Sequence, residues 1–232
     1  MTEELDAVFF DAGGTLWDVQ PSPDEMLGRA LSRRGANIDP KLVAEARRKA
    51  DWLFDKEFAK LTDATEGRFW INYDQFVLKE LGLDIDAAEL ASELNEEIGS
   101  VMNKVESWTA FPDAHPLLAR LEKRDLVVGL ISNATELARR VLDNLDMTKY
   151  FDHIVLSDEV KVRKPNPEIF WIAAKKAGVL PSRSLYIGDR LATDIVGARA
   201  AGFNAMLVDR TNVFPDANVI KFRDLRSVQA YL

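Results

Sequence analysis

The sequence predicts an α/β protein, in which a parallel sheet is flanked by helices and a bundle of four helices is inserted near the N-terminus. From about residue 104 onward, short apolar runs alternate with helical periods, as in right-handed βαβ units. Between about residues 20 and 103, apolar residues instead recur at three- and four-residue steps. We therefore expect a sheet domain formed by residues 1–18 and 104–232, and a helical domain formed by residues 19–103.

The first element is a short buried strand, because residues 5–10 form a nearly continuous apolar run. Four amphipathic helices are predicted after it, and three of them have clear start signals. Residues 22–25 form a capping box with proline at the first helical position, residues 39–40 are Asp-Pro, and residues 86–89 form a second capping box. The remaining helix carries its apolar residues at helical spacing over 69–81.

The second half of the chain continues the alternation of strands and helices. Apolar runs flanked by helical segments read as strands covered on both faces. The predicted strands span 126–131, 154–156, 184–187 and 205–208, and the predicted helices span 136–145, 167–177 and 192–201.

Composition limits the possible functions. The 232 residues carry a formal net charge of −8, which argues against nonspecific nucleic-acid binding because that needs a basic surface. The chain has no cysteine, which excludes disulfides and thiol nucleophiles, and only two histidines, which makes a histidine-rich zinc site unexpected. We find no signal peptide and no apolar run long enough for a membrane span, so we expect a cytoplasmic protein.

Chemically reactive side chains follow several of the predicted strands. Asp11 comes directly after the first strand, and Ser132 and Asp189 follow two later ones. Lys164 lies in a loop before a helix that Asn166 opens. Each of these residues taken alone could be an ordinary turn, helix-start or surface residue. Because ligands of open α/β sheets bind at the carboxyl ends of the strands, however, we expect these groups to converge.

In their order and spacing, Asp11, Ser132, Lys164 and the pair Asp189 and Asp194 resemble the four motifs of the haloacid dehalogenase superfamily of hydrolases. The resemblance covers nearly the whole chain. It implies a Rossmann-like parallel sheet core flanked by helices, with a four-helix-bundle cap inserted after the first motif and closing over the sheet edge.

The resemblance also implies roles for individual residues. Asp11 would be the nucleophile that forms a covalent aspartyl intermediate, and Lys164 would neutralise the nucleophile and the transferring group. The substrate would be small and anionic, and it would be bound by Ser132 and Asn133.

A magnesium site is expected beside the nucleophile. Asp189 and Asp194 lie five residues apart across a helix start, so both carboxylates can approach one point, although acids there also suit the helix dipole. Together with Asp11 and the carbonyl of Gly13 they offer the oxygen ligands that Mg²⁺ prefers.

Gly13 departs from the pattern of the phosphatases in this superfamily, which usually carry a second aspartate at that position as general acid and base. Such a group contributes roughly 10²–10⁴-fold. We favour Mg²⁺-dependent hydrolysis of a phosphate ester.

Three alternatives stay open because of Gly13. A 2-haloacid dehalogenase needs no proton for its leaving group, and its cap arginine would be Arg47 or Arg48, although arginines on such a helix usually face solvent. A phosphonoacetaldehyde hydrolase would need a Schiff-base lysine from the cap. A ligand-binding member without turnover would need no acid or base at all.

Overall fold

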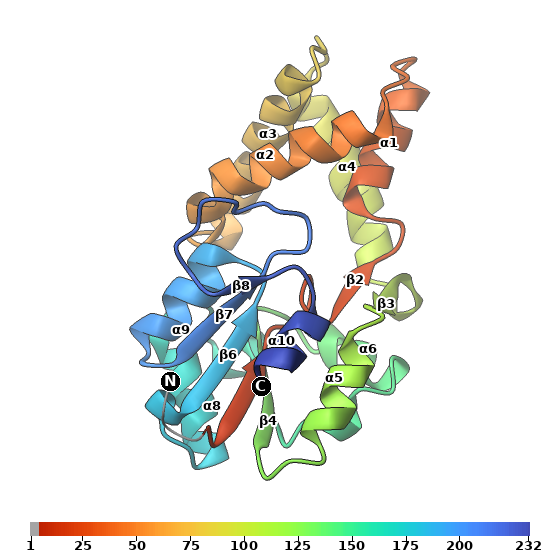
Figure 1. Ribbon diagram of the computed structural model, residues 1–232. Coiled ribbons are helices and arrows are strands. Elements are labelled where there is room, and N and C mark those ends of the chain that lie inside the picture. Colours follow the sequence, from red (N-terminus) through yellow and green to blue (C-terminus); the bar gives the residue numbers. More distant parts are fainter. Residues whose placement is uncertain (1–4) are drawn as a thin grey trace. The chain divides into compact units, whose positions relative to one another are not determined.

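The computed structural model of the protein describes residues 5–232 and divides into two compact units (Figure 1). The first unit comprises Met1–Asp18 and Trp108–Leu232, and the second comprises Val19–Ser107. The chain returns to the first unit four residues later than the expected residue 104, because a short 3₁₀ helix, Val105–Ser107, belongs to the second unit.

The first unit is an α/β domain whose six parallel strands are ordered β5-β4-β1-β6-β7-β8. This confirms the predicted fold class and places the first strand at the centre of the sheet. The short last strand was not predicted from the sequence. The strands are β1 (Ala7–Phe10), β4 (Val127–Ser132), β5 (His153–Leu156), β6 (Ser184–Gly188), β7 (Asn204–Val208) and β8 (Lys221–Phe222).

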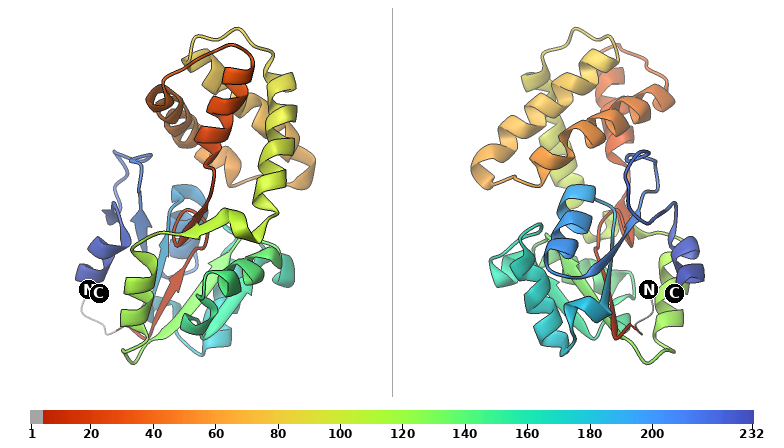
Figure 2. Two further views of the ribbon diagram at one scale, coloured as in Figure 1. Left: turned by 90° about the vertical axis from the view of Figure 1, so that its right-hand side faces the viewer. Right: turned by 60° about the vertical axis from the view of Figure 1, so that its left-hand side comes forward.

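Helices cover both faces of this sheet (Figure 2). On one face α8 (Pro167–Ala177) and α9 (Gly197–Ala200) pack against residues such as Phe9 and Tyr186. On the other face α5 (Ala114–Leu121) packs with α10 (Leu225–Tyr231). The remaining helices of the unit are α6 (Leu137–Asn144) and α7 (Ser157–Val160).

The predicted helix over 192–201 differs from the structure in its winding. Its first part, Leu191–Val196, is a π-helix, and only the residues of α9 continue as an α-helix. The backbone N–H groups of Asp194 and Ile195 both donate to the carbonyl of Arg190, which widens the turn. Single π turns of this kind often occur at functional sites.

The second unit contains the four predicted helices: α1 (Pro23–Arg33), α2 (Pro40–Phe58), α3 (Asp63–Glu80) and α4 (Ala87–Met102). Ser22, Asp39 and Asp86 accept hydrogen bonds from backbone N–H groups at the starts of α1, α2 and α4, as N-cap residues do. A core of their buried apolar side chains holds the helices together. That this unit acts as a cap over a substrate stays a prediction.

A separate two-stranded sheet lies where the chain leaves and re-enters the first unit. It pairs β2 (Trp17–Val19) with β3 (Trp108–Ala110). Among the described residues, no helix combines the length and the apolar character that crossing a bilayer requires.

Candidate active site

Three carboxylates meet at the carboxyl edge of the sheet. Asp11 follows β1 and Asp189 follows β6, and these two strands are neighbours with Phe10 opposite Ile187. Asp194 reaches the same place from the π-helix after β6. One oxygen of each carboxylate lies within 4.8 Å of an oxygen of the others, so the predicted metal-binding acids do come together.

Two glycines leave the space that these carboxylates occupy. A β-carbon added at Gly14 would lie 2.3 Å from Oδ2 of Asp189, and one added at Gly188 would lie 2.5 Å from Oδ2 of Asp194. Gly14 also has a φ of +76°, which residues with a β-carbon rarely adopt. The glycines are therefore needed where the acids pack against the backbone.

Asp194 is fully buried and fixed at both oxygens. Its Oδ2 accepts from the backbone N–H of Arg190 at 2.9 Å, and its Oδ1 accepts from Nζ of Lys164 at 2.6 Å. The widened π turn brings the carboxylate of Asp194 back to the backbone N–H of Arg190, the residue that precedes the π-helix. A buried charge of this kind is stable only when it is paired and hydrogen-bonded, as it is here.

Lys164 lies at the centre of the cluster and is 3% exposed. Its Nζ donates to Oδ1 of Asp11 at 2.6 Å and to Oδ1 of Asp194 at 2.6 Å. Its third partner is the hydroxyl of Tyr186, at 2.8 Å. An ammonium has three N–H donors, so each donor has an acceptor.

Asn133 contacts the backbone of Lys164 through both polar atoms of its side chain. Its Oδ1 accepts from the backbone N–H of Lys164 at 2.7 Å, and its Nδ2 donates to the backbone carbonyl of Lys164 at 2.9 Å. The amide thus ties the end of β4 to the loop that carries the lysine. We now expect Asn133 to act by holding Lys164 in place, while contact with substrate remains untested.

Ser132 is the last residue of β4, directly before Asn133, and is 6% exposed. Within the described residues its hydroxyl makes no hydrogen bond, which leaves it available to a ligand. The structure therefore keeps Ser132 as a candidate substrate-binding group.

Tyr186 is the member of the cluster that the sequence analysis missed. It lies in the middle of β6 and looks like any other buried strand residue. Its ring contacts Phe170 edge to face, with 5.0 Å between the centroids. Burial, with Asp194 and Asp11 nearby, holds the pKa of its hydroxyl well above the usual range, so the hydroxyl stays protonated.

Burial also dominates the electrostatics of the charged groups. It raises the pKa of Asp11, although Lys164 opposes this effect, and together with Asp11 and Asp194 it raises the pKa of Asp189 well above its usual range. Burial alone would lower the pKa of Lys164, but Asp11 and Asp194 outweigh it and raise that pKa. Lys164 therefore stays charged, while the raised pKa values of Asp11 and Asp189 make these two carboxyl groups easier to protonate than ordinary ones.

The donor set fits magnesium. All three side chains offer carboxylate oxygen, and the hard cation Mg²⁺ takes oxygen ligands and tolerates water in its remaining positions. Nitrogen and sulfur ligands, which would favour zinc or copper, are missing from this cluster.

Gly13 leaves open space beside the nucleophile. A β-carbon added there would meet nothing within 4 Å, and its φ is not in the positive range. The adjoining loop is held at Thr15, whose hydroxyl lies 3.4 Å from Oδ1 of Asp189 and whose carbonyl accepts from Arg210 at 2.8 Å. Arg210 in turn forms a two-pronged ion pair with Asp113.

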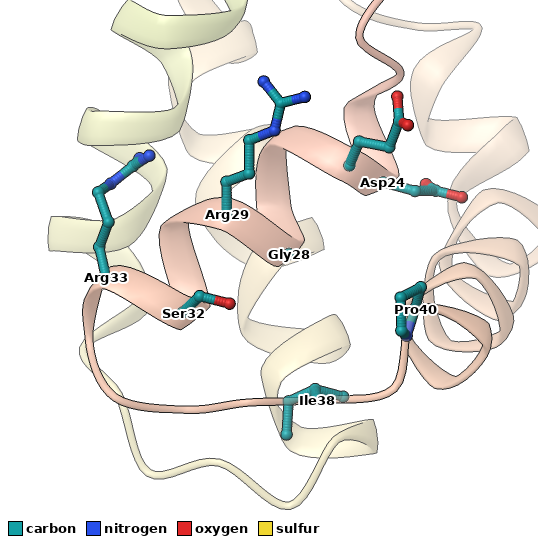
Figure 3. Close-up of a pocket in the computed structure, with 8 residues that line it drawn as sticks. Asp24, Gly28, Arg29, Ser32, Arg33, Ile38 and Pro40 are labelled. Carbon is teal, nitrogen blue, oxygen red and sulfur yellow. The ribbon is translucent and has the colours of Figure 1, made fainter.

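The helical unit contains a surface pocket of about 460 Å³ between α1 and the start of α2 (Figure 3). Its charged groups already have partners in several cases, since Arg33 pairs with Glu93 and Glu97, and Asp24 pairs with Arg47. None of the predicted site residues lines it. The lining residues are Asp24, Glu25, Gly28, Arg29, Ser32, Arg33, Ile38 and Pro40.

Arg47, one of the two candidate cap arginines, does not face solvent as expected. Its side chain is 13% exposed, and its Nε lies 2.6 Å from Oδ1 of Asp24. Its guanidinium also lies over the ring of Tyr73, 5.2 Å from the centroid. The charge of Arg47 is therefore engaged within the helical unit.

Comparison with known proteins agrees with this arrangement. The model of a family described as haloacid dehalogenase-like hydrolase matches residues 5–202. A glyceraldehyde 3-phosphate phosphatase from Methanopyrus kandleri is 27% identical over 209 residues, which are 89% of this chain and 84% of that protein. A phosphoglycolate phosphatase from Shigella boydii is 28% identical over 211 residues, 86% of this chain and 79% of that protein. The solved structure of an L-2-haloacid dehalogenase covers 99% of both chains with a TM-score of 0.64 and 21% identity, a likeness of fold.

Proposed function

Because the chain belongs to the haloacid dehalogenase-like hydrolase family, we propose that it hydrolyses a small phosphate ester, with Mg²⁺ as cofactor and Asp11 as nucleophile. One observation carries the proposal: Asp11, Asp189 and Asp194 converge on one point beside the ammonium of Lys164. This arrangement suits a divalent cation and a phosphoryl group together. The two phosphatase relatives support the same substrate class.

In the first step a carboxylate oxygen of Asp11 attacks the phosphorus atom. The new bond is between that oxygen and phosphorus, and the bond between phosphorus and the ester oxygen breaks. The alcohol leaves with its electron pair and takes a proton from water, because Gly13 offers no acid. In the second step water attacks the phosphorus of the aspartyl phosphate, which releases inorganic phosphate and restores Asp11.

Lys164 stays charged through both steps and stabilises negative charge at the nucleophile and on the phosphoryl oxygens. Ser132, whose hydroxyl has no other partner in the described structure, would donate to one of those oxygens. Asp11, Asp189, Asp194 and the carbonyl of Gly13 would hold Mg²⁺, which supplies further positive charge to the transferring group when bound.

Dehalogenation is the competing activity, because a departing halide needs no proton and Gly13 would then cost nothing. That activity would require a cation in the helical unit to bind the carboxylate of the haloacid. Arg47 is a poor candidate, since it already pairs with Asp24. Arg48 is then the remaining candidate for that role.

A parallel screen of phosphate monoesters and 2-haloacids, each with Mg²⁺ and with a chelator, tests the proposal. We expect release of phosphate that needs Mg²⁺ and disappears in Asp11→Asn, which keeps the shape of the side chain but is a poor nucleophile. Release of halide that persists in chelator would overturn the proposal.

A further inference from the structure

The hydroxyl of Tyr186 has three hydrogen-bond partners. Nζ of Lys164 lies 2.8 Å from it, the carbonyl of Ile131 lies 3.0 Å from it, and Oδ1 of Asp194 lies 3.3 Å from it. The lysine can only donate and the carbonyl can only accept. The carboxylate of Asp194 can also only accept, so the single phenolic proton is donated to Ile131 or to Asp194. In either case a lone pair of the oxygen points to the ammonium.

Within residues 5–232, this lone pair is the one uncharged hydrogen-bond acceptor of the Lys164 ammonium. The other two acceptors are the carboxylates of Asp11 and Asp194. Since Lys164 is almost completely buried, loss of the third acceptor would leave an N–H group without a partner and away from water. The ammonium would then turn or shift to recover a third bond.

The side chain of Tyr186 is held firmly by its surroundings. Its ring is fully buried between the sheet and α8, where it packs on Phe170. Its second contact is the backbone of Ile131, directly before Ser132. One hydroxyl thus links β6, the end of β4 and the lysine.

We propose that Tyr186 is a positioning residue, which holds the ammonium of Lys164 in line with the nucleophile Asp11. The role rests on the proposed phosphatase activity, but the geometry that it controls is measurable without that activity. Nothing in the four sequence motifs assigns a task to this side chain.

The test is Tyr186→Phe, which removes the hydroxyl and keeps the ring. We expect kcat and kcat/KM to fall together, by about tenfold to about 10²-fold, with KM unchanged, because the displaced charge acts on the transition state. Activity is measured per folded protein, after thermal unfolding has been compared with that of the parent.

Tyr73→Phe is the matched control. Tyr73 is also buried, and its hydroxyl also lies near a backbone carbonyl, that of Arg47 at 3.2 Å, and a carboxylate oxygen, Oδ1 of Asp51 at 3.1 Å. It lies in the core of the helical unit. We expect this variant to lose a comparable amount of thermal stability and to keep the kcat and KM of the parent.

A second measurement needs no turnover. In protein labelled with ¹⁵N-lysine, a buried and triply bonded ammonium exchanges slowly with water and gives its own Nζ–H signal, which Lys164→Met identifies by its loss. We expect Tyr186→Phe to shift this signal and speed its exchange at least about tenfold, whereas Tyr73→Phe leaves it unchanged.

The two measurements separate the two proposals. A parent protein that hydrolyses no phosphate ester would defeat the proposed function, and the ammonium signal would then decide the role of Tyr186 alone. An ammonium signal that is the same in Tyr186→Phe and the parent would overturn the role. If the parent is active, the role would also be overturned by a Tyr186→Phe variant whose ammonium signal changes but whose kcat equals that of Tyr73→Phe.

Discussion

Gly14 and Asp189 are packed so closely that a single methyl group at Gly14 would occupy the position of the carboxylate, 2.3 Å from its Oδ2. Contacts shorter than 3.0 Å do not occur at real β-carbons, so one of the two groups would have to move. The backbone of the loop after β1 and the acid after β6 therefore depend on each other.

Gly14→Ala should displace Asp189 and weaken Mg²⁺ binding by roughly 10–100-fold, as loss of a supporting contact at a metal site does. Calorimetric titration with Mg²⁺ measures this effect. Gly35→Ala is the control, because Gly35 also has a positive φ, +81°, but open space around it. Both variants should lose about 1–2 kcal/mol of stability from the unfavourable φ, and only the first should lose metal affinity. Equal Mg²⁺ affinities in the two would contradict the prediction.

Asp189→Asn should reduce Mg²⁺ affinity at least tenfold, because a neutral amide replaces one of three charged ligands. Asp158→Asn removes the same charge from an exposed position on α7 and should bind Mg²⁺ like the parent. Titration of both variants at one pH makes the comparison. Parent-like binding by Asp189→Asn would remove this residue from the metal site.

Gly13→Asp should add the missing acid and base. A β-carbon at Gly13 would have open space, and the φ of Gly13 is not positive, so a side chain can be introduced there without backbone strain. Hydrolysis of an alkyl phosphate such as glycerol phosphate should rise, by up to roughly 10²–10⁴-fold. The gain should be much smaller for 4-nitrophenyl phosphate, because nitrophenolate leaves without a proton.

The control for this substitution is the double variant Asp11→Asn with Gly13→Asp, which has the acid but no nucleophile and should be inactive. A folded Gly13→Asp protein that hydrolyses both esters at the parental rate would count against a phosphatase site.

Asp74 should make the helical unit less stable as the pH rises. Burial raises its pKa from 3.8 to about 6, although Arg47 opposes this shift. Below about pH 4 the carboxyl is protonated in the folded and unfolded chain and has no effect. Between about pH 4 and 6 the unfolded chain ionises first, so the free energy of unfolding falls by up to about 3 kcal/mol and then stays level.

Asp74→Asn removes this titration. The variant should melt higher than the parent at pH 7 and by a much smaller margin at pH 4, as thermal unfolding across this range would show. A difference in melting temperature that does not change with pH would contradict the raised pKa of Asp74.

The placement of most site residues followed from the sequence for a topological reason. Asp11, Ser132 and Asp189 each end an apolar strand, and the carboxyl ends of parallel strands meet at one edge. Local signals at Ser22 and Asp39 similarly predicted where helices begin, because a cap depends on residues close in the chain.

What was missed depends on contacts between distant segments. Tyr186 joins the cluster because the register of β6 turns its ring toward the loop of Lys164, and no nearby residue reveals this. The link between Asn133 and Lys164 spans 31 residues, so no local pattern indicates it. Arg47 is largely shielded from solvent because it pairs with Asp24, which lies on a different helix. β8 has only two residues, too few to show a strand pattern.

The order of the strands has a consequence for how the protein is made. β1 leaves the ribosome long before its partners β4 and β6, which begin at Val127 and Ser184. Its fully buried, apolar residues cannot pair in the native way until most of the chain has been synthesised. The helical unit, by contrast, is local in sequence and complete much earlier. Because distant pairing is slow, the apolar residues of β1 lack their native partners for much of synthesis, which is the condition under which a nascent segment is most prone to aggregate.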